Sequence, residues 1–254
     1  MLLRAVGPTL GLAPFNVFGV LANPRLTLYR GSASLATNAG WGGTAALIAA
    51  FTQVGAFPIT NSSSADAALL QTLASGTYTA HVTGSAGARG VALLELYDAD
   101  SGTPAVELAN ISTRAMVGAV RDGALIAGFV ITGTTANTVM IRGVSQSLGT
   151  LHGMRRALGA SQVAVFDSAG RQIAANAIWS KPGRGNSRAE DEDDDEDRQS
   201  EIEETSDRTG AFRLPRGSTD SALVLTLPPG AYTAQVTGRN NASGVALVEI
   251  YEVR

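Results

Sequence analysis

The sequence predicts an all-β protein made of two tandem antiparallel β-sandwich modules, and two observations carry this prediction. Residues 76–97, GTYTAHVTGSAGARGVALLELY, and residues 230–251, GAYTAQVTGRNNASGVALVEIY, are identical at most of their aligned positions. Apolar and β-branched residues also alternate with polar ones in short stretches bounded by Gly, Ser and Asn, as half-buried strands require. A duplicated segment of this length is typical of independently folded modules rather than of a solenoid coil.

The similarity extends upstream in the same order. The segment LLRAVGPTLG at residues 2–11 matches MIRGVSQSLG at 140–149, Trp41 matches Trp179, and GAF at 55–57 matches GAF at 210–212. We therefore expect one module in residues 1–100, a linker and start of the second module in 101–122, and the second module in 123–254. That module carries an acidic insert at 187–207.

Each module has its own set of predicted elements. Strands are expected at residues 68–73, 77–83, 91–97, 124–131, 222–227, 231–237 and 245–251. The duplication places Tyr78, Val82, Val91 and Leu93 in the same core environments as Tyr232, Val236, Val245 and Leu247. A short helix is expected only in the first module, where Thr44 caps a segment with Leu47, Ile48, Phe51 and Val54 on one face.

The predicted strand at residues 124–131, ALIAGFVI, has no counterpart in the first copy. The first module then lacks its opening strands, either because the segment is truncated there or because its open edge accepts a strand from a neighbouring chain. Alternatively, residues 124–131 serve the first module and leave the second one short.

Composition indicates a secreted or surface-exposed β protein. The chain has no Cys, which excludes a disulfide framework and thiolate metal sites. Its apolar runs are far shorter than the roughly 20 residues that span a bilayer, so no membrane insertion is expected. We expect no nucleic-acid partner, because no basic patch is interleaved with aromatic residues. Met1 leads directly into repeat sequence, and for an exported protein we expect the signal peptide upstream of this chain.

The acidic insert holds 12 of the 22 acidic residues of the chain. Like-charge repulsion and few apolar residues predict a disordered loop. The insert then serves solubility or spacing, binds a specific protein partner, or holds Ca²⁺ weakly through its carboxylates. The candidate Ca²⁺ ligands are Glu190, Asp191, Asp193, Asp195 and Asp197. No other cofactor is expected.

Motifs for catalysis are missing from the sequence: there is no nucleophile elbow, zinc-binding helix, Walker loop or dinucleotide fingerprint. The duplicated acids Glu95 and Glu249 lie between apolar residues, which predicts the solvent face of a strand. Asp66 and Asp220 precede strands, where a carboxylate accepts backbone hydrogen bonds in a turn. These patterns predict a protein that is not an enzyme.

The duplicated Trp41, Trp179, Arg4 and Arg142 are the candidate ligand-binding residues. An exposed aromatic ring beside a guanidinium would form a platform for stacking carbohydrate. In the alternative interpretation, each Trp closes one end of the core and the Arg covers that Trp by a cation-π contact.

The strings LLRAVGPTLG, NPRLTLY, GWGG, AAFTQVGAF, LIAGFVITG, LPPGAYTAQVTG and GVALVEIY resemble tandem repeats of large secreted and cell-surface bacterial proteins. The hairpin GAYTAQVTG…GVALVEIY is also similar to pre-peptidase C-terminal domains, which are small accessory β-sandwiches. This resemblance implies a non-catalytic structural or adhesive segment of an extracellular protein, with neighbouring modules as partners. The alternative is a carbohydrate-binding accessory module of an extracellular enzyme, with surface polysaccharide as its partner.

Overall fold

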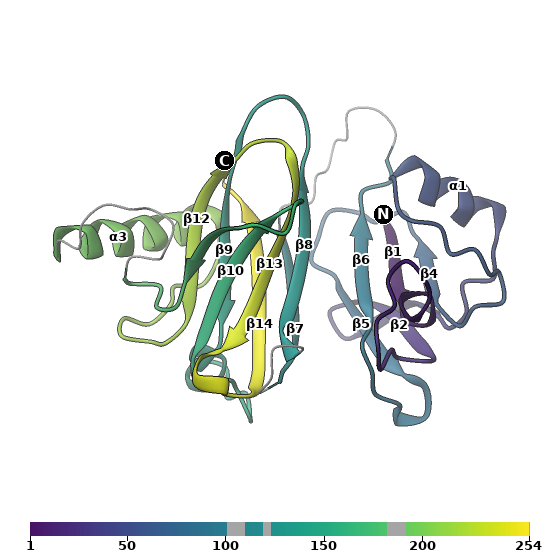
Figure 1. Ribbon diagram of the computed structural model, residues 1–254, viewed down its shortest axis with the longest axis horizontal. Helices are drawn as coiled ribbons and strands as arrows, with labels where there is room; N and C mark the ends of the chain where they lie inside the picture. Colours follow the sequence, from purple (N-terminus) through teal and green to yellow (C-terminus); the bar gives the residue numbers. More distant parts are fainter. Residues whose placement is uncertain (101–109, 119–122, 182–191, 254) are drawn as a thin grey trace. The chain divides into compact units, whose positions relative to one another are not determined.

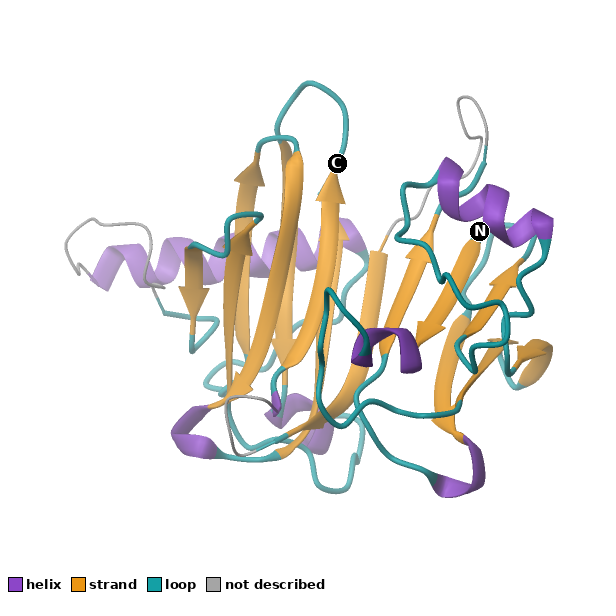
Figure 2. Cartoon of the chain, turned by 45° about the vertical axis from the view of Figure 1, so that its right-hand side comes forward, coloured by secondary structure: helices purple, strands orange, loops and turns teal. Residues whose placement is uncertain are grey.

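A computed structural model describes residues 1–100, 110–118, 123–181 and 192–253. The chain divides into two compact units, Met1–Leu108 and Ala109–Arg254. Strands dominate both units, and the few helices lie outside the sheets (Figure 1, Figure 2). The predicted all-β class is therefore confirmed. No helix in the described residues is long and apolar enough to cross a membrane.

The first unit contains two antiparallel three-stranded sheets, with strand orders β4-β1-β6 and β3-β2-β5. Alternating side chains of both sheets meet in one core, which includes Leu3, Leu26 and Leu28. The strands are β1 (Leu2–Val6), β2 (Pro24–Arg30), β3 (Ala33–Asn38), β4 (Ala67–Leu70), β5 (Thr79–Gly84) and β6 (Leu93–Tyr97).

The second unit contains two antiparallel four-stranded sheets, with strand orders β12-β9-β14-β7 and β11-β10-β13-β8. Their shared core includes Ile141, Val165, Val236 and Val248. The strands are β7 (Asn110–Val117), β8 (Leu125–Ile131), β9 (Asn137–Val144), β10 (Ser161–Asp167), β11 (Gln172–Asn176), β12 (Ser221–Leu227), β13 (Gly230–Gly238) and β14 (Gly244–Glu252).

The two units have the same order of corresponding strands. Strands β1 to β6 occupy the sheet positions that β9 to β14 occupy in the second unit. The second unit differs by having β7 beside β14 and β8 beside β13. Strands β6 and β5 have no such neighbour among the described residues of the first unit. The first unit is thus the same arrangement without one edge strand in each sheet.

Helices and 3-10 turns complete both units. They are η1 (Pro8–Gly11), α1 (Ala45–Gln53), η2 (Ser85–Gly87), α2 (Gln146–Thr150), α3 (Glu192–Thr209) and η4 (Arg239–Asn241). As predicted, the Thr44 hydroxyl caps α1 by accepting a hydrogen bond from the Leu47 amide. Leu47 and Phe51 are buried beside Trp41, as predicted. Ile48 was predicted on the same face of the helix, but its side chain is half exposed.

The GAF segments end α1 and α3 in the same way. Gly55 and Gly210 have φ values of +69° and +71°, which a residue with a side chain rarely adopts. The amide of Ala56 donates to the Phe51 carbonyl, and the amide of Ala211 donates to the Ser206 carbonyl, both at 2.9 Å. This hydrogen bond from the residue after the glycine is the helix-terminating arrangement known as the Schellman motif.

The acidic insert at 187–207 was expected to be a disordered loop, and this expectation is wrong for residues 192–207, which belong to α3 (Glu192–Thr209), whereas residues 187–191 lie outside the described residues. The acidic residues are concentrated in the N-terminal part of the helix, where negative charge is favourable. Ile202 is only 2% exposed and packs with Trp179 and Leu214, as Leu47 of α1 packs with Trp41. Burial of this one apolar side chain, with Thr205 and Ser206 beside it, therefore docks a helix that charge alone would leave in solvent.

The predicted core residues fall on two faces. Tyr232 and Val236 lie in the core between the sheets, whereas Val245 and Leu247 face the outer side of β14 and are partly buried beside the α3 layer. In the first unit Tyr78 and Val82 are partly buried, while Val91 is 47% and Leu93 36% exposed. The core environments of the two copies are thus only partly equal, because the first unit has fewer strands to cover them.

Candidate functional site

A buried ion pair joins the middle strands of one sheet in the second unit. Arg142 on β9 lies opposite Glu249 on β14, and its Nε and Nη2 atoms donate to Glu249 Oε2 at 2.8 and 2.6 Å. Nη1 donates to the Phe212 carbonyl at 2.5 Å, and the guanidinium lies 4.4 Å from the centre of the Phe212 ring. The Arg142 side chain is fully buried, so each of its contacts replaces hydration.

The first unit repeats this arrangement with looser geometry. Arg4 Nη1 donates to the Phe57 carbonyl at 2.6 Å, and the guanidinium lies 4.3 Å from the Phe57 ring centre. Arg4 Nη2 approaches Glu95 Oε2 to 2.8 Å, but the two atoms are not aligned as a hydrogen bond. Glu95 is also the more exposed of the two glutamates.

A tyrosine completes each ion pair. The hydroxyl of Tyr97 donates to Glu95 Oε1 at 2.7 Å, and that of Tyr251 donates to Glu249 Oε1 at 2.9 Å. Burial, together with the neighbouring carboxylate, raises the pKa of both tyrosines well above its ordinary value of 10.0. Both phenols therefore stay neutral hydrogen-bond donors at any physiological pH.

The second shared network surrounds an aspartate in each unit. Asp66 Oδ1 accepts from the amides of Gly7 and Thr9, at 2.7 and 3.4 Å. Asp220 Oδ1 accepts from the amides of Ser145 and Ser147, at 2.6 and 3.3 Å. The predicted role of these carboxylates as acceptors for turn amides is confirmed.

Each of these aspartates also holds the tryptophan of its own unit. The Trp41 amide donates to the Asp66 carbonyl at 2.7 Å, and the Trp179 amide donates to the Asp220 carbonyl at 2.9 Å. The indole of Trp41 donates to the Asn61 carbonyl, and that of Trp179 donates to the Ser218 hydroxyl. The loop after the first strand, the strand that carries the aspartate and the tryptophan are thereby joined.

The four candidate ligand-binding residues are therefore interior residues. Trp41 is 4% exposed, and Trp179, Arg4 and Arg142 are fully buried. They do not present a stacking platform for carbohydrate. The arginines lie over Phe57 and Phe212, and the tryptophans close the core beneath α1 and α3. The alternative interpretation is therefore correct for the two tryptophans, but the arginines cover phenylalanine rings and not the tryptophans, as it had expected.

Glu95 and Glu249 were expected on the solvent face, which is wrong for Glu249 and inaccurate for the partly buried Glu95. The alternating pattern does place them on the face away from the core between the sheets. That face, however, is covered by a further layer of helix and loop. The matching positions of Arg4 and Arg142 in the duplicated segments were the available signal for a paired charge.

The Ca²⁺ site expected in the acidic insert stays a prediction, because the structure describes the side chain of only one candidate ligand, Asp197. Glu190 and Asp191 lie outside the described residues, and Asp193 and Asp195 lie in the first turns of α3. Asp197 is exposed. Within the described part of the chain, no group of three or more His, Asp or Glu side chains is placed to hold a metal ion.

Other acidic residues of the insert have arginine partners. Glu203 contacts Arg216 at 3.1 Å and Arg213 at 3.5 Å, and Asp207 forms an ion pair with Arg213. The Arg216 hydrogen bond holds the pKa of Glu203 below its ordinary value of 4.5, and the Arg213 hydrogen bond holds that of Asp207 below 3.8.

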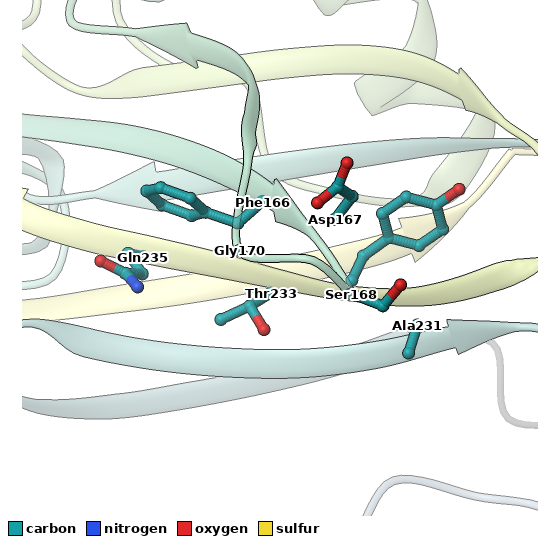
Figure 3. Close-up of a pocket in the computed structure, with 8 residues that line it drawn as sticks. Phe166, Asp167, Ser168, Gly170, Ala231, Thr233 and Gln235 are labelled. Atoms are coloured by element: carbon teal, nitrogen blue, oxygen red, sulfur yellow. The ribbon is translucent and has the colours of Figure 1, made fainter.

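A shallow hollow on the outer face of the β10–β13 strand pair is a surface site with mixed chemistry, and sequence reasoning missed it. Its volume is about 380 Å³, and Phe166 lies opposite Thr233 across the pair. Figure 3 shows the Phe166 ring near Thr233 and Gln235, with Asp167 at the end of β10 and Ser168 in the following turn. An aromatic ring surrounded by hydroxyl, amide and carboxylate groups is a common environment for a polar ligand.

The corresponding face of the first unit also carries an aromatic residue. Tyr29 on β2 lies opposite Thr79 on β5, as Phe166 lies opposite Thr233. The Tyr29 ring lies 4.8 Å from the ring of His81, which takes the place of Gln235. The two outer faces thus share their aromatic and threonine positions but differ in the third residue.

Comparisons with known proteins identify no family. No protein-family model and no curated protein matches the chain. Among solved structures, the pre-peptidase C-terminal domain of collagenase from Bacillus anthracis is similar with 10% identity and a TM-score of 0.30, over 56% of this chain and 89% of that one. The VP2 subviral particle of infectious bursal disease virus has 10% identity and a TM-score of 0.21, over 99% of this chain and 56% of that one.

Proposed function

We propose that the chain is a non-catalytic structural segment of a secreted or cell-surface protein, in which the two β-sandwich units act as spacer modules. The observation that carries this proposal is the repeated use of the shared charged residues. Arg4, Asp66 and Glu95, like their counterparts in the second unit, are all engaged in holding strands, turns and helix termini together. What the two units have in common is thus the means of staying folded.

The position of these contacts suits a spacer. Arg142 connects β9 to β14 and to the segment after α3, and Asp220 connects β12 to the turn after β9. The strands β1 and β9 are therefore each tied to both neighbouring strands and to the layer outside them. Such cross-connections make unfolding cooperative.

Stretching single molecules of the full chain between two handles tests this proposal. Two separate unfolding events are expected, releasing up to about 370 and 500 Å of extended chain at roughly 3.4 Å per residue. Asp66→Asn is expected to lower the force of one event only, and Asp220→Asn that of the other. A gradual extension without separate events would contradict a spacer role.

Carbohydrate binding is the second candidate function, and the hollow beside Phe166 favours it. Aromatic faces stack on sugar rings, and Ser168, Thr233 and Gln235 supply hydrogen-bonding groups around this ring. The Asp167 carboxylate beside them already accepts hydrogen bonds from Arg171. Co-sedimentation of the chain with insoluble polysaccharides is the test. If the chain sediments with a polysaccharide, and Phe166→Ala abolishes this binding while Tyr29→Ala does not, the binding site is the hollow beside Phe166. If the chain does not sediment with any polysaccharide, carbohydrate binding is contradicted and the structural function is the one supported.

A further inference from the structure

We propose that the open edge of the first unit, formed by β5 and β6, binds a β-hairpin of the β7–β8 type that is supplied by a neighbouring repeat unit. This inference goes beyond the proposed function, because the edge can fail to bind a hairpin while both units still unfold as separate modules. The proposed interaction surface is the edge strands β5 and β6, and the pairing of β8 with β13 and of β7 with β14 in the second unit shows how a hairpin fits such an edge.

The receiving strands are nearly the same in both units. Segments 76–84 and 230–238 share the pattern G-x-Y-T-A-x-V-T-G, and segments 90–97 and 244–251 share G-V-A-L-x-E-x-Y. In the second unit these strands are β13 and β14, and they pair with β8 and β7 over nearly their whole lengths. In the described residues of the first unit, β5 pairs with β2 alone and β6 with β1 alone.

The inward side chains of the first unit show the consequence. Val236, Val248 and Ile250 are buried under the neighbouring strands β8 and β7. The corresponding residues Val82, Leu94 and Leu96 are only partly buried. Unpaired backbone groups and incompletely covered apolar side chains therefore occur on the same two strands, and together they favour the addition of an extended segment.

The second unit also defines which hairpin fits. Phe129 lies opposite Tyr232, and their rings are stacked with centres 5.5 Å apart. Ala127 lies opposite Ala234, and Leu125 lies opposite Val236. In the first unit these partners are Tyr78, Ala80 and Val82. The strand that binds beside β5 should therefore have an aliphatic, a small and an aromatic residue at alternate positions, in that order. Its main chain would form hydrogen bonds with the main chain of β5.

Tyr78 supports this assignment. The Arg30 guanidinium lies 5.8 Å from the centre of the Tyr78 ring, whereas the Tyr232 ring stacks on Phe129. The Tyr78 hydroxyl donates to the Ala74 carbonyl at 2.8 Å, as the Tyr232 hydroxyl donates to the Pro228 carbonyl. The ring is thus held in the same way in both units, and a long, mobile side chain lies beside it in the first.

The experiment adds a fluorescent peptide with the sequence of residues 110–133 to the full chain and follows anisotropy and amide hydrogen exchange. Saturable binding of one peptide per chain is expected, with new protection at residues 79–84 and 93–97 and no change at 230–238. Tyr78→Ser is expected to weaken binding at least tenfold, whereas the matched Tyr232→Ser in the second unit leaves it unchanged. Thermal melting of each variant confirms that both units remain folded.

A second pair of peptides keeps the test independent of protein variants. The peptide with Phe129→Asp is expected to lose binding, and the peptide with Val130→Thr, whose position faces away from the core, is expected to keep it. Absence of binding, or protection that appears at 230–238 through strand exchange, would overturn the proposal. In a monomeric chain, amides of β5 and β6 that are fully protected before the peptide is added would overturn it too.

Discussion

Arg142 and Glu249 face each other on the neighbouring strands β9 and β14, with two guanidinium nitrogens 2.8 and 2.6 Å from one carboxylate oxygen. The equivalent Arg4 and Glu95 approach to 2.8 Å without hydrogen-bond alignment. In the second unit β7 lies on the far side of β14, whereas β6 has no such neighbour in the described residues. The better-aligned ion pair is the one whose strand is held on both sides.

Removing Glu249 is expected to destabilise the second unit strongly. Glu249→Ala leaves the Arg142 guanidinium buried without its counter-charge, which typically costs about 3–5 kcal/mol. Glu95→Ala is expected to cost less, because Glu95 is more exposed and less well aligned. Urea unfolding checks this, since Trp41 and Trp179 report on one unit each. An Arg142→Met, Glu249→Leu double variant is the control, and it should be more stable than Glu249→Ala.

Ile202 is expected to anchor α3. Ile202→Ala should lower the free energy of unfolding of the second unit by about 2–5 kcal/mol, as is usual when a buried aliphatic side chain is truncated. Glu201→Ala is the matched control, because that side chain is exposed and adjacent on the same helix. Trp179 fluorescence and helix content by circular dichroism measure the effect. Equal stability of the two variants would show that α3 is not docked.

The attachment of α3 is expected to weaken in acid. The Arg216 hydrogen bond holds the pKa of Glu203 below 4.5 in the folded protein. A depressed pKa contributes stability that is fully present above pH 4.5 and is lost as the pH falls through the folded pKa. The protection of the 199–209 amides, expressed relative to the intrinsic exchange rate at each pH, should therefore decrease below that pH. In Glu203→Gln this decrease should be smaller, and a decrease equal to that of the unmodified protein would assign the effect to other carboxylates.

Both shared aspartates are expected to stabilise their own units. Asp220→Ala leaves the amides of Ser145 and Ser147 without their acceptor in a buried turn, at a cost of about 1–3 kcal/mol for an unsatisfied group. Asp66→Ala should act in the same way on the first unit through Gly7 and Thr9. Separate melting of the two units, followed by hydrogen exchange, measures each effect. A shift of both units in either variant would contradict independent folding.

The first unit is expected to be the less stable of the two. Its sheets have three strands each instead of four, and its inward residues on β5 and β6 stay partly exposed. In denaturant, the Trp41 transition should precede the Trp179 transition. The variant Trp41→Phe isolates the second transition, and a single coincident transition would mean that the units unfold as one.

The local pattern of the sequence was sufficient for the Thr44-capped helix, for the aspartates of the turns and for seven strands, which are β4, β5, β6, β8, β12, β13 and β14; the other strands were not predicted. Each of the predicted features depends on residues close together in the chain: alternation for β13 and β14, a hydroxyl before α1, and a carboxylate beside a strand for Asp66 and Asp220. The duplication added the expectation that corresponding segments share a strand order, since identical residues at alternating positions pack in the same way.

Only the tertiary structure decided what lies on the outer face of the β9–β14 sheet. Alternation shows that Glu249 and Val248 lie on opposite faces of β14, but it does not show that a layer of helix and loop covers the face that carries Glu249. That layer depends on contacts between residues far apart in sequence, such as Ile202 with Trp179 and Arg142 with Phe212. For the same reason the charge of residues 190–197 predicted disorder, whereas one buried isoleucine and two distant arginines, Arg213 and Arg216, favour a docked helix.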